Sequence, residues 1–246
     1  MSSALEELPQ QEAEEEGQKL TVLEHLEELR KRLIYAVIGV AITTAISFAF
    51  TQPLLRILQE PAGNTPFITY EVTEQFSTFF KVSFYSGLAL GLPVILYQVI
   101  RFLLPGLTKQ ERRYIRYLLP GSVLCFAMGV AFAYYVALPP ALRFLIGFLP
   151  SDIATAQIRL ANYISFVTTL VFGIGAVFET PIVIYFLAKL RIVNHKMLAK
   201  NRKYALLGVF VIAAIVTPTP DPLTQTMVAL PLLALYEAGV WLAKIA

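Results

Sequence analysis

One carboxylic acid lies in an apolar segment, where a charged group is energetically unfavourable. Glu179 lies within an apolar stretch, residues 161–188, that is long enough to cross a bilayer. A charged carboxylate inside a membrane-spanning helix costs at least about 2.5 kcal/mol on insertion scales, so such residues usually face a polar cavity or carry a proton. Two interpretations stay open for Glu179: a functional group in a polar passage, or a neutral, structural hydrogen-bonding group.

Two further carboxylates stand among cations in polar segments. Glu28 belongs to a charged segment just before the first apolar run, and Glu111 is the only acid among five cations in 101–116. Both are candidate recognition groups. Simpler explanations also stand, because Glu28 can pair with Arg32 four residues on and Glu111 completes a capping box with Thr108.

Polar side chains also gather beside the break in the last apolar stretch, 204–243, which reads Thr217-Pro-Thr-Pro-Asp221-Pro. Asp221 precedes Pro222 and can cap the helix that follows. Thr217 and Gln225 can each hydrogen-bond another transmembrane helix, for about 0.6 to 2 kcal/mol. Packing of the two flanking segments against each other is the alternative.

Motifs of enzymes and metal sites are absent from the sequence, which has no P-loop, no HExxH, no Gly-x-Ser-x-Gly and no Ser/His/Asp pattern. We interpret the two histidines, His25 and His195, as surface residues, and the single cysteine, Cys125, as a packing residue. The cations do not gather on a polar domain with aromatic platforms, as in nucleic-acid binding. We therefore expect no enzyme activity, no cofactor, no metal and no nucleic-acid partner.

Composition places these groups in a membrane protein. Of the 246 residues, 57% are hydrophobic and only 15% are charged, unlike a soluble domain. We expect an all-α integral membrane protein with a disordered acidic tail, residues 1–20, and one six-span domain, residues 21–243. The expected spans are 33–50, 79–100, 117–138, 161–188, 204–217 and 223–243.

The segments that join the spans carry several local signals. Thr21 and Glu24 form a capping box, which predicts an amphipathic helix that runs into the first span. Residues 51–75 are predicted as an exposed loop with little regular structure. The pair Pro139-Pro140 is predicted to end the third span, ahead of a short surface helix at 141–149. Gly87 and Gly91 permit close helix contact, and Glu179 with Pro181 should interrupt the fourth span.

The cations predict an orientation. Sixteen of the twenty Lys and Arg fall before the first span, in the second-to-third or fourth-to-fifth loop, or after the last span. By the positive-inside rule both termini are then cytoplasmic. The fifth span is shorter than the hydrocarbon core of about 30 Å. Two short spans through a thinned bilayer are favoured over a re-entrant hairpin, which other protein would have to shield.

Taken in order, these residues resemble the motifs of the TatC family, core subunits of the twin-arginine protein translocase. The resemblance covers about residues 20–243. It rests on these motifs: His25-Leu-Glu-Glu-Leu-Arg-Lys-Arg32, Pro93-Val-Ile-Leu-Tyr-Gln98, Phe102 with Pro105, Glu111-Arg-Arg113, Phe178-Glu-Thr-Pro181, Thr217-Pro-x-Pro-Asp221 and Gln225. Pro53 is expected to be a further structural position, with Pro93, Pro105 and Asp221.

The resemblance implies a receptor and channel-forming subunit in the bacterial cytoplasmic (inner) membrane. Its fold would be a concave, cupped bundle of six helices, and export of folded cargo would be driven by the proton-motive force. Glu28 and Glu111 would read the two arginines of a signal peptide, since a guanidinium pairs bidentately with a carboxylate. The residues expected around them are Arg30, Arg32 and Phe102.

Partners follow from the same resemblance. Thr217 and Gln225 would dock the single-span subunits TatA and TatB, further TatC copies would join, and Glu179 would face the concavity. The alternative function is a proton-coupled secondary transporter that uses Glu179. The sequence has no internal repeat that would favour such a transporter.

Overall fold

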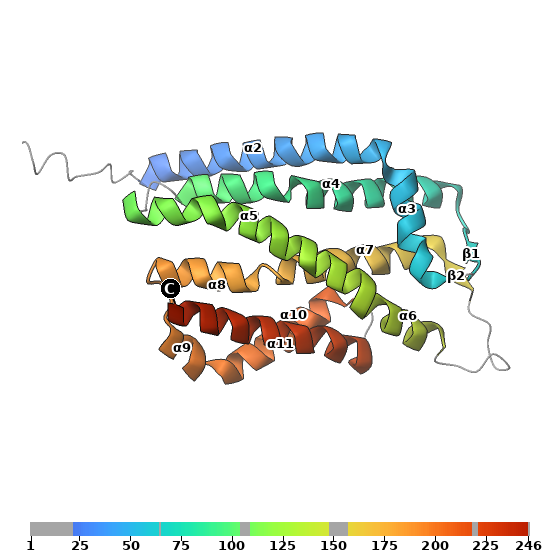
Figure 1. Ribbon diagram of the computed structural model, residues 1–246. Helices are drawn as coiled ribbons and strands as arrows, with labels where there is room; N and C mark the ends of the chain where they lie inside the picture. Colours follow the sequence, from blue (N-terminus) through green and yellow to red (C-terminus); the bar gives the residue numbers. More distant parts are fainter. Residues whose placement is uncertain (1–21, 64, 104–108, 148–156, 218–220, 246) are drawn as a thin grey trace, which may run out of the picture.

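The computed structural model describes residues 22–63, 65–103, 109–147, 157–217 and 221–245, with the side chains of 22, 23 and 109–117 left out (Figure 1). The described residues form helices joined by short connections, with one pair of two-residue parallel strands, β1 (Phe67–Ile68) and β2 (Ile158–Arg159). The helices are α2 (Val22–Ala49), α3 (Thr51–Gln59), α4 (Val72–Leu103), α5 (Lys109–Phe132), α6 (Leu138–Ile146), α7 (Leu160–Val177), α8 (Thr180–Lys189), α9 (His195–Lys200), α10 (Arg202–Val216) and α11 (Pro222–Ile245).

The long helices run side by side between two ends of the bundle (Figure 1). At one end, here called the amino end, α2 begins, α4 ends, α5 begins and α11 ends. The opposite, distal end carries α3, α6 and the strand pair. Among the described residues, five helices are long and apolar enough to cross a membrane, counting α7 and α8 as one and joining α5 to α6.

The first two spans pack through small residues, as Gly87 and Gly91 predict. A Cβ added at Gly87 would lie 2.4 Å from the Thr44 Cα. The Thr43 hydroxyl crosses the same contact and donates to the Gly87 carbonyl at 2.7 Å. Close backbone approach is therefore what holds α2 to α4, since α2 leaves most of its apolar side chains exposed.

Gly87→Ala is expected to lower stability by about 1 to 3 kcal/mol, because the new methyl meets backbone that cannot rotate away. Gly208→Ala on α10 is the matched control, since nothing lies within 4 Å of a Cβ there. The measurement is thermal unfolding in detergent. Equal behaviour of the two variants would contradict the close-packing account.

The loop predicted at 51–75 is wrong. The segment forms α3, a 3-10 turn (Glu60–Ala62), β1 and the first turn of α4. Pro53 lies in the first turn of α3, where its missing N–H costs nothing. Leu54, Leu55 and Leu58 pack on the buried core, so the helix forms because one face is apolar, a spacing that the Pro and Gly residues of the segment obscured.

The predicted end of the third span at Pro139-Pro140 is also wrong. A π-helical turn, Ala133–Ala137, leads directly into α6, and Pro139 occupies the first turn of that helix. In the π-helical turn the Leu138 N–H bonds the Ala133 carbonyl, five residues back. This widened turn changes the hydrogen-bond pattern just ahead of the prolines, and the chain stays helical through both of them. The short helix expected at 141–149 is therefore the continuation of the span, and Leu138, Ala141 and Leu142 are buried.

The fourth span breaks as predicted. α7 ends at Val177 and α8 begins at Thr180, with Pro181 in its first turn and Glu179 immediately before it. α10 has 15 residues, about 22 Å at 1.5 Å per residue. This length is less than the hydrocarbon core, so α10 falls outside the five helices counted above.

Candidate functional site

The amino end brings together the motif residues of α2 and α4. The His25 ring on α2 lies 4.4 Å, centroid to centroid, from the Phe102 ring at the end of α4. His25 and Glu28 are three residues apart and therefore share a helix face. Phe102 therefore contacts the turn of α2 that precedes Glu28. α2 was predicted to start in this region, but Thr21 lies outside the described residues.

The Glu28 carboxylate forms an ion pair with a residue of its own helix. Arg32 donates from Nε to Glu28 Oε1 at 2.6 Å, and the Arg32 terminal nitrogen lies 2.6 Å from the same oxygen. The pairing that i,i+4 spacing predicts is therefore present, and Glu28 stays partly exposed, with 24% of its side chain accessible. Both contacts fall on Oε1, which leaves Oε2 as the acceptor for an incoming donor. Arg30 is exposed beside them.

For Glu111 only the position of the backbone is described, not the contacts of the side chain. Its backbone lies in the first turn of α5, which begins at Lys109 at the amino end (Figure 1). Its side chain, together with Pro105 and Thr108, lies outside the described residues. The structure therefore brings the backbone of the Glu111 motif to the same end as Glu28 and Phe102.

Glu179 lies in the break between α7 and α8 and is only 9% exposed. Within the described part of the chain neither carboxyl oxygen has a hydrogen-bond partner. The buried Ser122 hydroxyl of α5 lies near enough to act on the carboxyl group, without the geometry of a hydrogen bond. A buried polar group without a partner is costly to the folded state.

The polar residues around 217–225 have separate environments. Asp221 Oδ1 accepts from the Thr224 backbone N at 2.6 Å, so Asp221 caps α11 as predicted. Thr217 is 4% exposed and donates to the Ala213 carbonyl at 2.8 Å. Gln225 is partly exposed and donates to the Phe210 carbonyl at 3.1 Å. Thr217 therefore packs inside the hairpin, and Gln225 borders its surface.

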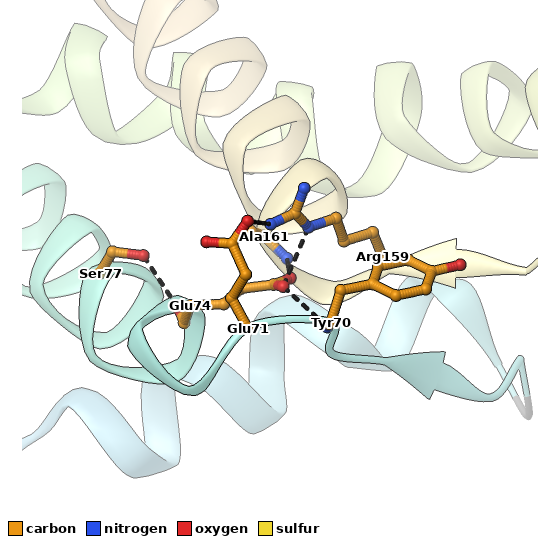
Figure 2. Close-up of polar contacts among 6 residues, drawn as sticks. All are labelled: Tyr70, Glu71, Glu74, Ser77, Arg159 and Ala161. Atoms are coloured by element: carbon orange, nitrogen blue, oxygen red, sulfur yellow. Dashed lines mark hydrogen bonds and ion pairs between the residues drawn. The ribbon is translucent and has the colours of Figure 1, made fainter.

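Sequence reasoning missed a buried ion cluster at the distal end (Figure 2). Glu74, 3% exposed, accepts from Arg159 Nε at 2.9 Å and from the backbone N of Tyr70 and Ala161 at 3.1 Å each. Glu71 lies 3.5 Å from Arg159, and the neighbouring carboxylates raise the pKa of the guanidinium, with the Glu74 hydrogen bond as the main cause. The cluster joins the start of α4 to β2 and α7.

Glu74→Gln is expected to lower the thermal unfolding temperature clearly, because the buried Arg159 contact loses its charge partner. Glu71→Gln is the control, since its side chain is 66% exposed and its contact with Arg159 is longer. A double variant with Arg159→Met should lose little more than Glu74→Gln alone. Additive losses in this cycle would show that the two side chains do not act as one unit.

A groove lies between helices of the membrane-spanning part. It has a volume of about 600 Å³ and is lined by α3, α4, α5 and α7, with aromatic side chains that include Tyr85, Phe126 and Phe172. Tyr134, which lines the groove, donates to the α3 carbonyl of Ile57 at 2.7 Å, and Tyr163 of α7 donates to the neighbouring carbonyl of Leu58 at 2.8 Å. The groove is apolar. Pro93 lies within α4, beyond the residues of that helix that line the groove.

The aromatic and ionic contacts had weak signals in the sequence. Arg159 is one of only four cations outside the basic segments, and a lone cation at a span boundary calls for a partner. His25 was interpreted as a surface residue. It is exposed, as expected, but its ring also contacts Phe102, a long-range pair that sequence spacing cannot reveal.

The family model and the relatives that match this chain point to the same family. Residues 24–231 match the model of the family described as Sec-independent protein translocase protein (TatC). A TatC protein of Carboxydothermus hydrogenoformans is 41% identical over 93% of this chain and 95% of its own length. A chloroplastic TATC protein of Pisum sativum is 38% identical over 97% of this chain and 68% of its own length.

Solved structures agree with the sequence comparison. A crystal structure of the twin arginine translocase receptor TatC superposes with a TM-score of 0.80 at 41% identity, covering 90% of this chain and 98% of that one. A second, in a detergent named DDM, gives a TM-score of 0.82 at 42% identity over 89% and 99%. The chain therefore belongs to the TatC family of Sec-independent protein translocase proteins; it is a multi-pass membrane subunit of a protein transport system and not an enzyme.

Proposed function

We propose that this chain is the core receptor and channel-forming subunit of a twin-arginine translocase, and that it binds the signal peptides of folded proteins at its amino end. The observation that carries the proposal is the placement of Glu28 and Phe102 on neighbouring helices. A carboxylate with one oxygen held by Arg32 and one available can take a guanidinium. An aromatic ring one turn away adds an apolar or cation–π contact.

Glu111 completes the proposed site. The start of α5 lies at the same end as α2 and the end of α4 (Figure 1). Two carboxylates on separate helices, Glu28 and Glu111, match two consecutive arginines in number and charge. Arg30 and Arg32 are the cations of the proposed site, and Arg32 holds Glu28 through the ion pair described above.

The topology proposed is six spans with both termini on the cytoplasmic side of the bacterial inner membrane. α2 begins and α11 ends at the same end (Figure 1), which requires an even number of crossings. With five long spans, α10 then supplies the sixth through a thinner part of the bilayer. The cations concentrate at this same end, which by the positive-inside rule is cytoplasmic.

TatA and TatB are the proposed partner subunits, and further copies of this chain are proposed to join them. Thr217 and Gln225 are the residues proposed to form the docking site for these subunits. Gln225 borders the surface, whereas Thr217 is buried behind it. Glu179 is the proposed functional group within the membrane, and the proton-motive force is the proposed energy source. The apolar groove supports the concave shape that such an assembly needs.

The deciding experiment is photo-cross-linking of the purified chain to a signal peptide with two arginines and to the same peptide with two lysines. Stronger labelling by the arginine peptide is expected, because only a guanidinium pairs bidentately with a carboxylate. Equal labelling by both peptides would contradict the assigned site.

The alternative, a proton-coupled transporter, rests on the buried Glu179 carboxyl. It requires solute flux in proteoliposomes of this chain alone, driven by a pH gradient and lost in Glu179→Gln. Flux that needs partner subunits and a folded cargo would favour the translocase instead.

A further inference from the structure

A set of cations at the amino end has no part in the signal-peptide site proposed above. Five exposed side chains, here called the basic platform, lie on and around α9 and at the end of α11: Arg191, Lys196, Lys200, Lys203 and Lys244. From residue 180 onward the chain has only two acids, Asp221 and Glu237. Asp221 caps the start of α11 at the distal end, so Glu237 is the only acid of this part near the platform.

The platform is held in a fixed position against α11. His195 Nδ1 lies 3.1 Å from the Val240 carbonyl oxygen, and the Tyr236 hydroxyl donates to the Leu198 carbonyl at 2.9 Å. Asn194 caps α9 by accepting from the Met197 N at 2.8 Å. Arg191 adopts φ 57°, a left-handed conformation that side chains with a Cβ seldom adopt. This left-handed residue ends α8, and the Ile192 N–H that follows it donates to the Leu187 carbonyl at 3.0 Å.

Its charge is not neutralised within the described part of the chain. Glu237 is engaged by Arg202 at 2.7 Å, and Arg202 is not a platform residue. No ion pair joins a platform cation to an acid among the described residues. A dense positive charge therefore faces outward at this end of the bundle.

Apolar side chains lie among these cations. Ile192, Met197 and Trp241 are 61%, 49% and 66% exposed. Tryptophan is enriched at membrane–water interfaces, and apolar side chains beside cations are typical of surfaces that rest in the headgroup layer. This mixture fits a lipid surface better than it fits a soluble acidic protein, which would leave the apolar groups uncovered.

We propose that the basic platform binds the phosphate headgroups of anionic phospholipids. Charge complementarity identifies the ligand, since cations next to the membrane end of a span attract anionic lipids. The same charge repels a signal peptide that carries arginines. The platform and the Glu28 region therefore select opposite charges at one end of the molecule, and lipid bound at the platform would anchor α9 and the end of α11.

The test uses the purified full chain in neutral detergent and measures lipid affinity by native mass spectrometry. The probes are phosphatidylglycerol and phosphatidylcholine with identical acyl chains. Lys196→Gln/Lys200→Gln is expected to bind phosphatidylglycerol roughly 30-fold more weakly than the unchanged chain. Arg56→Gln/Arg143→Gln, which removes two exposed cations of the distal end, is expected to keep the affinity.

Several outcomes would overturn the proposal. One is equal affinity for the two lipids, and another is equal loss in both double variants. The chain's own first twenty residues, with six glutamates, are the competing occupant. If phosphatidylglycerol bound only after deletion of residues 2–20, that segment and not lipid would cover the platform. Circular dichroism checks that each variant folds, and signal-peptide cross-linking separates this result from the proposed receptor function.

Discussion

Glu28→Gln is expected to weaken binding of a twin-arginine signal peptide by roughly 10- to 100-fold. The change removes a charge-assisted hydrogen bond, which contributes about 1.5 to 3 kcal/mol, and it keeps the size of the side chain. Arg32 is partly exposed and i,i+4 to Glu28, so the loss of their contact costs the fold little. Binding should therefore fall while the thermal unfolding temperature changes only slightly.

The measurement is the dissociation constant of a fluorescent signal peptide for the purified chain. Glu27→Gln is the matched control, since Glu27 is exposed on the adjacent position of the same helix. It should retain most of the affinity. If Glu27→Gln lost as much binding as Glu28→Gln, the peptide would be sensing the net charge of α2 and not one carboxylate.

Glu28 also shows how local spacing limits a sequence prediction. The four-residue interval to Arg32 predicts the ion pair that the structure contains. That interval says nothing about Phe102, which comes to the same face because α2 and α4 pack through Gly87 and Gly91. The glycine spacing predicts that the helices approach closely. It does not determine which residues meet at their ends.

The two errors in the fold have a common physical cause. In 51–75 and at Pro139-Pro140, prolines indicate a helix end when each is considered alone. Proline ends a helix only where its missing N–H would have been bonded, and first-turn positions have no such bond. Pro53 occupies such a first turn, and Pro139 follows a π-helical turn whose hydrogen bonds are shifted. The apolar residues that follow them, such as Leu54 and Leu142, bury against the core and determine that the helix forms.

The ion cluster at the distal end could not be predicted for a different reason. Glu74 and Arg159 are separated by 84 intervening residues, and the backbone donors of Tyr70 and Ala161 complete the site. Contacts of that kind depend on the whole fold. The five long apolar helices were predictable, because an apolar run long enough to cross a bilayer has few other stable structures.

Glu179→Leu is expected to raise stability by about 1 kcal/mol or more and to reduce export roughly tenfold or more. The stability gain follows because a buried carboxyl group without a hydrogen-bond partner destabilises the folded state. The loss of export follows if the group serves the transport step, since about 1.4 kcal/mol at the slow step changes a rate tenfold. Opposite changes in stability and function are the mark of a functional site.

Three measurements separate these effects: thermal unfolding in detergent, signal-peptide affinity, and export of a folded cargo in inverted vesicles that contain the partner subunits. The control is Thr168→Val on α7, where a hydroxyl of similar burial is already bonded to the Ile164 carbonyl at 2.6 Å. That variant should lose a little stability and keep export. Signal-peptide affinity should stay unchanged in both variants, because Glu179 lies within the membrane and Glu28 at the amino end. If Glu179→Leu left export intact while raising stability, the carboxyl group would have no role in transport.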